Sequence, residues 1–266
     1  METRSITDYL QTLDDIIPAL QLGVLPDYTG QVYHKFAESI TIGTTATVLS
    51  SLVNENPFNE NGDTLYLSSA SATDNQSIYI EGVLHSDGTI AAETKALNGQ
   101  TAVQLTNVYR TILRAYNNNG VEFTEDAYIS NEAVPTLGVP LAVNTYSHIP
   151  ASFQGKTVNQ TLSSIFTIPM GYTGFITNWY GTATKGKDVE LIAYARPTGG
   201  IFRYQERMFN FESSAQKQLP YLKFPGGTDF KIMARTSQGT VDGSCSYDFI
   251  LLKDEFISKS RPLAFR

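Results

Sequence analysis

The chain has 266 residues, a formal net charge of −7 at pH 7 and a sequence pI near 5.0. This length is sufficient for one large domain or two ordinary domains, each with a core that needs no disulfide or metal. The negative charge argues against a surface of clustered lysines and arginines that follows phosphates, so we expect no nucleic-acid partner. No apolar run reaches the ~20 residues that cross a bilayer and no leader is recognisable, so we expect no membrane partner and synthesis in a cytoplasm.

The composition favours a β-protein with many turns. Charged residues are only 17% of the chain, whereas Ser, Thr, Asn, Gly, Tyr and Phe are abundant. Such neutral polar surfaces are common in subunits that pack against neighbours, and secreted β-proteins share them. The single Cys245 has no intramolecular partner, and its strand-like surroundings predict a small buried thiol.

Residues 1–38 are predicted to form an N-terminal arm. Ser5 offers a helix N-cap with Asp8 three positions later, and apolar side chains then recur at roughly helical spacing as far as Leu20. We therefore expect a short amphipathic helix over residues 5–17, broken by Pro18. Two interpretations stay open for this helix: it caps its own sandwich, or it reaches a neighbouring subunit.

Residues 39–135 are predicted to form a first β-sandwich domain, because apolar residues alternate with period two from Ser39 onward. Turn signals at intervals of about ten residues are typical of sandwiches and barrels. Two of these signals, Ser86-Asp87-Gly88 and Asn98-Gly99, are expected to close hairpins. The predicted strands lie at residues 40–49, 64–68, 76–83, 90–97, 101–105, 109–115 and 122–129.

Residues 136–255 are predicted to form a second, jelly-roll-like β-sandwich domain, followed by a basic C-terminal tail at 256–266. The boundary is placed where Pro, Ser, Thr, Asn and Gln accumulate over residues 131–162. Lys185–Asp188 is expected to be a hairpin turn. An immunoglobulin-like sandwich is the closest competitor, but its paired cysteines are absent. The predicted strands lie at residues 164–168, 175–183, 189–195, 201–210, 218–224, 228–235 and 245–252.

No motif in the sequence indicates catalysis, so we expect no enzyme and no catalytic, cofactor-binding or metal-binding residues. The histidines, at positions 34, 85 and 148, lie in separate segments without a second ligand at metal-site spacing. A calcium site built from distant loops stays open, as does a hidden pair of carboxylates. Glu190 and Asp229 are the carboxylates on strand-like segments, and we expect both to face solvent.

One cluster of positive charge stands out in an otherwise acidic chain. It consists of Lys185, Lys187, Arg196, Arg203 and Arg207. These residues are either solvated charges that protect strand edges or contacts that set the register of an acidic partner surface.

Two passages of the sequence resemble β-rich virion proteins of tailed bacteriophages. The first comprises Leu67–Asp74, Ile78–Gly82 and Leu97–Val103, and the second extends from Ile168 to Phe224 and includes the run Ala195–Phe202. The resemblance implies a structural component of the particle and gives no catalytic residues. Residues 1–40 and the basic tail fall outside it.

From this resemblance we expect a virion protein that decorates or cements the capsid through noncovalent contacts. Its partners would be the major capsid protein or other virion proteins, and further copies of itself, for which a trimer is expected. One alternative is a structural protein of the tail, baseplate or fibre attachment. Another is a host-glycan-binding module, for which Trp179, Tyr180, Tyr194 and Tyr204 could form an aromatic platform or could belong to the core.

Overall fold

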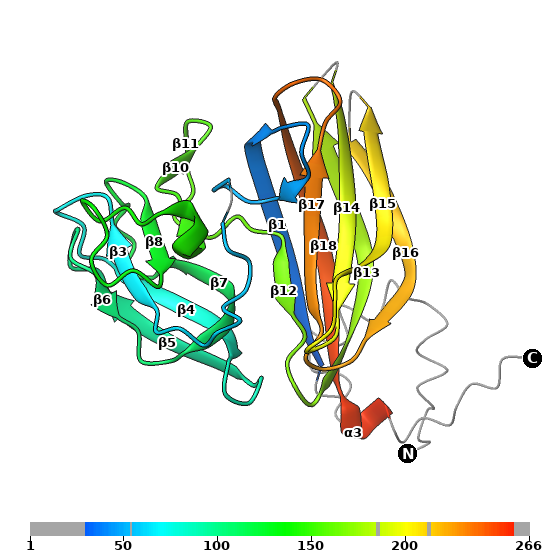
Figure 1. The fold of residues 1–266 in the computed structure, drawn as a ribbon, viewed down its shortest axis with the longest axis horizontal. Helices are drawn as coiled ribbons and strands as arrows, with labels where there is room; N and C mark the ends of the chain where they lie inside the picture. Colours follow the sequence, from blue (N-terminus) through cyan, green and yellow to red (C-terminus); the bar gives the residue numbers. More distant parts are fainter. Residues whose placement is uncertain (1–29, 54, 185–186, 212–213, 258–266) are drawn as a thin grey trace, which may run out of the picture.

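The computed structural model describes residues 30–53, 55–184, 187–211 and 214–257. The protein is all-β and built from antiparallel sheets, as the composition predicts. Two bodies lie side by side (Figure 1). We call them the sandwich, which holds both ends of the described chain, and the inserted body, which comprises the residues between 55 and 160. The predicted helix at residues 5–17 and most of the basic tail lie outside the described residues.

The sandwich consists of two facing sheets, one with the strand order β1-β18-β13-β16 and one with the order β12-β17-β14-β15, in which the short β2 also pairs with β17. The first sheet contains β1 (Gly30–Ile42), β13 (Tyr172–Ala183), β16 (Ser214–Phe224) and β18 (Val241–Lys253), which the short α3 (Asp254–Ile257) follows. The second contains β2 (Thr47–Val48), β12 (Ile165–Thr167), β14 (Asp188–Arg196), β15 (Arg203–Phe211) and β17 (Asp229–Arg235).

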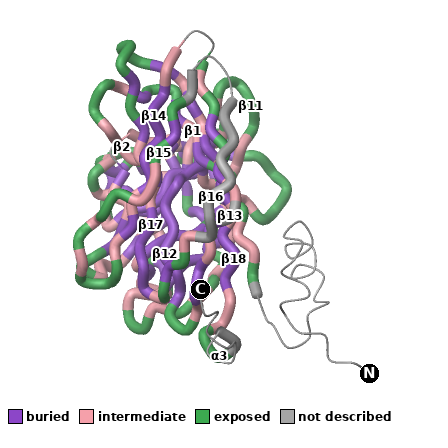
Figure 2. Tube along the Cα trace, turned by 90° about the vertical axis from the view of Figure 1, so that its right-hand side faces the viewer, coloured by how far each residue is buried: buried purple, intermediate pink, exposed green. Residues whose placement is uncertain are grey.

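Aromatic side chains from both sheets fill the core of the sandwich. Trp179 and Phe249 of the first sheet and Phe166 and Phe230 of the second are fully buried. The Phe166 and Phe249 rings stack with centroids 4.8 Å apart, and Phe230 meets Phe249 edge to face at 5.2 Å. Burial of such rings supplies the largest apolar contribution per residue to a core. The tube in Figure 2 shows the result: buried residues follow the strands and exposed residues follow the loops.

The inserted body leaves the sandwich after β2 and returns to it before β12. It has a three-stranded sheet of order β5-β4-β7, a four-stranded sheet of order β6-β3-β8-β9, and a separate hairpin of two short strands. Its own core includes Leu67, Ile78, Ile80 and Tyr109. The elements are β3 (Tyr66–Ser69), β4 (Ser77–Leu84), β5 (Ile90–Ala96), β6 (Val103–Gln104), β7 (Tyr109–Asn117), β8 (Ala127–Ser130), η2 (Ala142–Asn144), β9 (Thr145–Ile149), β10 (Ser152–Phe153) and β11 (Lys156–Thr157).

The division of the chain differs from the boundaries at 38/39 and 135/136. β1, which begins inside the predicted arm, pairs with β18, so that Ala37 lies opposite Cys245. In the other direction, β9 lies beyond residue 135 but pairs with β8 of the inserted body. The first difference arises because the partner of β1 lies about 200 residues later in the chain, and local periodicity carries no information on such pairing. The second arises because the polar run over residues 131–162, at which the boundary was placed, includes the loop between two paired strands, β8 and β9.

Two predicted hairpins are wrong. β5 pairs with β4 and β6 pairs with β3, so Asn98-Gly99 joins strands of different sheets. Gly99 has φ +55, and a Cβ there would meet the Ala72 carbonyl oxygen at 2.3 Å. The glycine is therefore needed because two backbone segments approach closely at this point. The segment before Asp188 likewise connects β13 to β14 in the opposite sheet. The hairpin at Ser86–Gly88, between β4 and β5, is confirmed.

Candidate functional site

The five residues of the predicted basic cluster do not share one environment. Arg203 and Arg207 are exposed on β15, and Lys187 is half-buried. Arg196, at the end of β14, is turned into the contact between the two bodies, where its side chain is 12% exposed. Lys185 lies outside the described residues.

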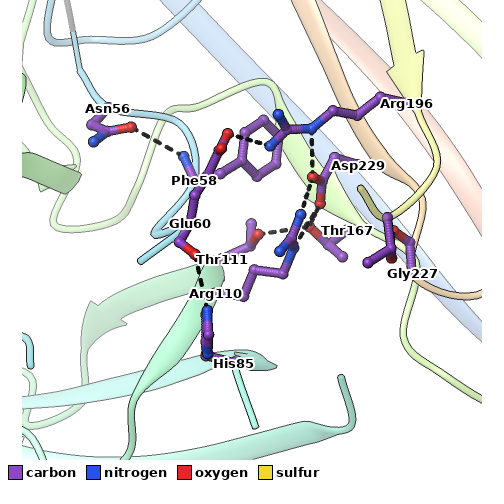
Figure 3. A network of polar contacts seen from close by, with 11 residues as sticks. Asn56, Phe58, Glu60, His85, Arg110, Thr111, Thr167, Arg196, Gly227 and Asp229 are labelled. Atoms are coloured by element: carbon purple, nitrogen blue, oxygen red, sulfur yellow. Dashed lines mark hydrogen bonds and ion pairs between the residues drawn. The ribbon is translucent and has the colours of Figure 1, made fainter. Parts of the chain in front are cut away.

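Asp229 is the centre of the contact between the bodies (Figure 3). Its side chain is completely buried and accepts hydrogen bonds from two arginines. Arg110, on β7 of the inserted body, donates from Nε to Oδ1 at 3.2 Å and from Nη2 to Oδ2 at 2.5 Å. Arg196, which faces Asp229 across the β14–β17 pair, donates from Nε to Oδ2 at 2.9 Å. The Thr167 hydroxyl donates to Oδ1 at 2.8 Å, so the buried carboxylate is fully partnered.

Arg196 extends this network toward a second acidic residue and two aromatic rings. Its Nη2 donates to Glu60 Oε1 of the inserted body at 2.5 Å. Its guanidinium lies 5.3 Å from the ring centroid of Phe58 and 4.4 Å from that of Phe202. Ion pairs and cation–π contacts therefore fix the same side chain from both bodies.

A second polar cluster surrounds Glu81 of β4, at another point of the same contact. Tyr33 of β1 donates to Glu81 Oε1 at 2.8 Å, Tyr79 donates to Oε2 at 2.9 Å, and Arg114 donates to Oε2 at 2.9 Å. Burial, reinforced by the charge of Glu81, raises the pKa of Tyr33 far above its usual range, so the phenol stays a donor.

Apolar side chains also contribute to the contact between the bodies. Val83 and Leu113 of the inserted body belong to the core of the sandwich rather than to their own core. Beside them, Lys35 of β1 is buried and its Nζ donates to the Leu113 carbonyl oxygen at 2.5 Å. Burial lowers the pKa of Lys35 to about 8. Apolar packing, ion pairs and hydrogen bonds therefore join the two bodies.

Asp229 and Glu190 are buried, so the prediction that they face solvent is wrong. Both do point away from the sandwich core, because their neighbours Phe230, Val189 and Leu191 face into it. Asp229 is covered by the inserted body, and a local sequence pattern cannot predict this burial. Glu190 is 6% exposed and is paired with Arg235, its partner across β17, and with Arg207 at 3.6 Å.

The aromatic platform considered for glycans is not assembled. Trp179 is completely buried in the core. Tyr180 belongs to the β13 sheet, whereas Tyr194 and Tyr204 belong to the opposite sheet, where their rings meet edge to face at 6.2 Å. The four aromatic residues therefore lie on two different sheets and in the core between them, and they do not form one surface.

The concave features of the described surface are modest. A hollow of about 210 Å³ lies between β1 and the β10–β11 hairpin and is lined by residues that include Phe36, Glu38, Phe153 and Lys156. Burial raises the pKa of Glu38. Across the described ranges, no group of three or more His, Cys, Asp or Glu side chains is placed to hold a metal ion. In the same ranges no helix has the length and apolar character of a membrane span.

No family model matches the chain, and no curated protein matches it either. A structure of the Gt strain of infectious bursal disease virus is 10% identical, with 84% of this chain and 77% of that chain covered and a TM-score of 0.21. The VP2 subviral particle of that virus is 10% identical, with coverages of 89% and 81% and a TM-score of 0.17. A Cry1Da tryptic core variant of Bacillus thuringiensis is 9% identical, with coverages of 80% and 53% and a TM-score of 0.16. At these identities and TM-scores, the likenesses lead to no conclusion about fold or function.

Proposed function

We propose that this chain is a structural protein of a bacteriophage virion, which decorates or cements the capsid by noncovalent contacts and acts without catalysis. Its partners are the major capsid protein or neighbouring virion proteins, and further copies of itself. Tail, baseplate or fibre attachment is the alternative location within the same particle. The sequence resemblance to phage virion proteins supports the class of particle, and the arrangement of the sandwich supports a structural role.

The observation that carries the proposal is the path of the chain through the sandwich. We count β2 and β12 as one strand interrupted by the inserted body. The eight strands then form two sheets of order β1-β18-β13-β16 and β2/β12-β17-β14-β15, and every connection except the one from β14 to β15 crosses from one sheet to the other. We infer from this strand order that the sandwich is a jelly roll, an architecture of viral capsid domains and also of lectins and cupins. One fold serves several functions, so the fold alone does not assign a role. The inserted body also supports a structural role, because it gives the sandwich an additional outer surface for contacts with neighbours.

Copy number in purified particles tests this proposal. In quantitative mass spectrometry of the phage that encodes this chain, we expect hundreds of copies per particle, on the scale of the major capsid protein. A few copies per particle would favour the alternative location in the tail. Absence from washed particles would contradict a virion role.

Charge reversal at Arg203 and Arg207 tests whether β15 contacts the partner surface. Both side chains are exposed on a strand at the edge of its sheet. If they face an acidic partner, Arg203→Glu with Arg207→Glu should reduce incorporation into particles at least tenfold, because like charges would then meet. Competition between wild-type and variant chains during assembly measures this ratio.

The matched control reverses two positive charges on the inserted body, Lys95→Glu with Lys156→Glu. It changes the net charge by the same amount and should leave incorporation unchanged. Equal incorporation of both double variants and wild type would assign Arg203 and Arg207 to the protection of a strand edge instead.

A further inference from the structure

The loop between β8 and β9 presents the largest group of exposed aliphatic side chains among the described residues. Five such residues fall within ten positions, a density unusual for a surface loop. Their exposed fractions are 90% for Val134, 71% for Leu137, 42% for Val139, 65% for Leu141 and 61% for Val143. We call residues 133–144 the aliphatic loop.

The aliphatic loop carries no charge. No Asp, Glu, Lys, Arg or His occurs between Ala133 and Asn144. The acidic residue at its base, Glu132, is occupied internally: its Oε1 accepts hydrogen bonds from the Leu141 N–H at 2.9 Å and from Asn144 Nδ2 at 2.7 Å. The loop is therefore an uncharged patch on an acidic protein.

The backbone of the loop is held in one conformation. Ser68 Oγ of β3 donates to the Gly138 carbonyl oxygen at 2.8 Å, and a Cβ at Gly138 would meet the Ser69 carbonyl oxygen at 1.8 Å. Leu137 next to it has φ +51, a left-handed conformation that leucine rarely adopts and that Asn or Gly adopts readily. An apolar side chain that is both exposed and in an unfavourable backbone conformation gains nothing within the monomer.

We propose that the aliphatic loop is a contact between copies of this chain, in which the loop of one copy packs against the same loop of a second copy around a symmetry axis. The five side chains expose on the order of 500 Å² of aliphatic surface, which is more than half of the ~800 Å² that each partner buries in a stable interface. An identical apolar patch on both partners is self-complementary, as closed symmetry requires.

Charge favours a second copy over a lipid surface. Two chains of net charge −7 repel each other, and a patch without ionisable groups, such as the aliphatic loop, adds no local repulsion to a contact between them. A membrane-binding loop instead combines apolar side chains with Trp, Tyr, Lys or Arg at the interface. Residues 133–144 contain none of these four types.

Sedimentation velocity of the purified full-length chain tests this contact separately from incorporation into particles, on which the proposed function depends. We expect wild type to form a closed oligomer at micromolar concentration. The variant Leu137→Asn with Leu141→Asn removes two of the aliphatic side chains, and its dissociation constant should rise at least 100-fold. Asn suits the left-handed conformation at position 137, so folding is retained, which circular dichroism verifies.

The matched control is Ile201→Asn with Val121→Asn, whose side chains are 74% and 62% exposed and lie outside the loop. It should sediment like wild type. A monomeric wild type at 100 µM, or equal dissociation of control and loop variant, would overturn the proposal. Loop-dependent binding of a monomer to phosphatidylcholine vesicles would overturn it in favour of a lipid surface.

Discussion

Asp229→Ala is expected to lower the free energy of unfolding by about 3–5 kcal/mol, because it leaves buried positive charge without its partner. The Asp229 carboxylate is completely buried, while the side chains of Arg110 and Arg196 are only 18% and 12% exposed. Loss of the carboxylate removes hydrogen bonds from both arginines and from Thr167 at once. It also weakens the contact between the bodies, because Arg110 belongs to one body and Asp229 to the other.

Urea unfolding followed by Trp179 fluorescence measures this change. The control is Asp248→Ala, since Asp248 also pairs with a basic residue, but its partner His34 is 65% exposed. A pair this exposed contributes less than about 1 kcal/mol, so the control should unfold close to wild type. Equal losses for the two variants, or a loss below about 1 kcal/mol for Asp229→Ala, would show that the network does not hold the bodies together.

The stability of the protein is expected to fall as pH rises from 5 to 8, because Glu55 is buried as the neutral acid. Burial raises the pKa of Glu55 from 4.5 to about 8, although the Ser50 hydroxyl and the charge of Lys35 act in the opposite direction. One oxygen, Oε1, has no hydrogen-bond partner. In this window the folded chain keeps a proton that the unfolded chain releases. The buried neutral Glu55 makes its full contribution to stability below pH 4.5. Above that pH the free energy of unfolding falls by at most about 1.4 kcal/mol per pH unit.

Glu55→Gln keeps the shape of the side chain and removes the proton equilibrium. Urea unfolding of wild type and variant at each half unit between pH 5 and 8 gives a difference that should change steadily with pH in favour of the variant. Above pH 8 the lowered pKa of Lys35 reverses the slope, because the unfolded chain then holds the extra proton, so the comparison ends there. Parallel curves for the two proteins would contradict a neutral Glu55.

Local patterns were sufficient for most strands and insufficient for their pairing. The alternation of Ile78 and Ile80 predicts β4, because side chains at every second residue face one core. Most of β1 was predicted to belong to the N-terminal arm, and this error has another origin. Its partner β18 lies at the far end of the sequence, and the insertion of a whole body between β2 and β12 separates neighbours in space by more than 100 residues.

Residues of the candidate site were identified from the sequence, but their contacts were not. Arg196 was singled out for its charge, but its role depends on Asp229, which lies 33 positions later and is hidden by the inserted body. A buried ion pair between bodies has no sequence signal, since each residue by itself has the pattern of an exposed strand residue. Arg110, the third member, was missed for the same reason. The aliphatic loop was not predicted, because the exposure of its side chains is a property of the folded backbone.

The central claim is that the protein is a rigid, surface-acting subunit of a phage particle. A cryo-electron microscopy map of the intact particle, with this chain labelled by a small fusion, tests it most directly. We predict density for the sandwich and the inserted body at regular positions on the shell, in the relative orientation that Asp229 fixes. Label on the tail would contradict the capsid location, and particles without label would contradict the account as a whole.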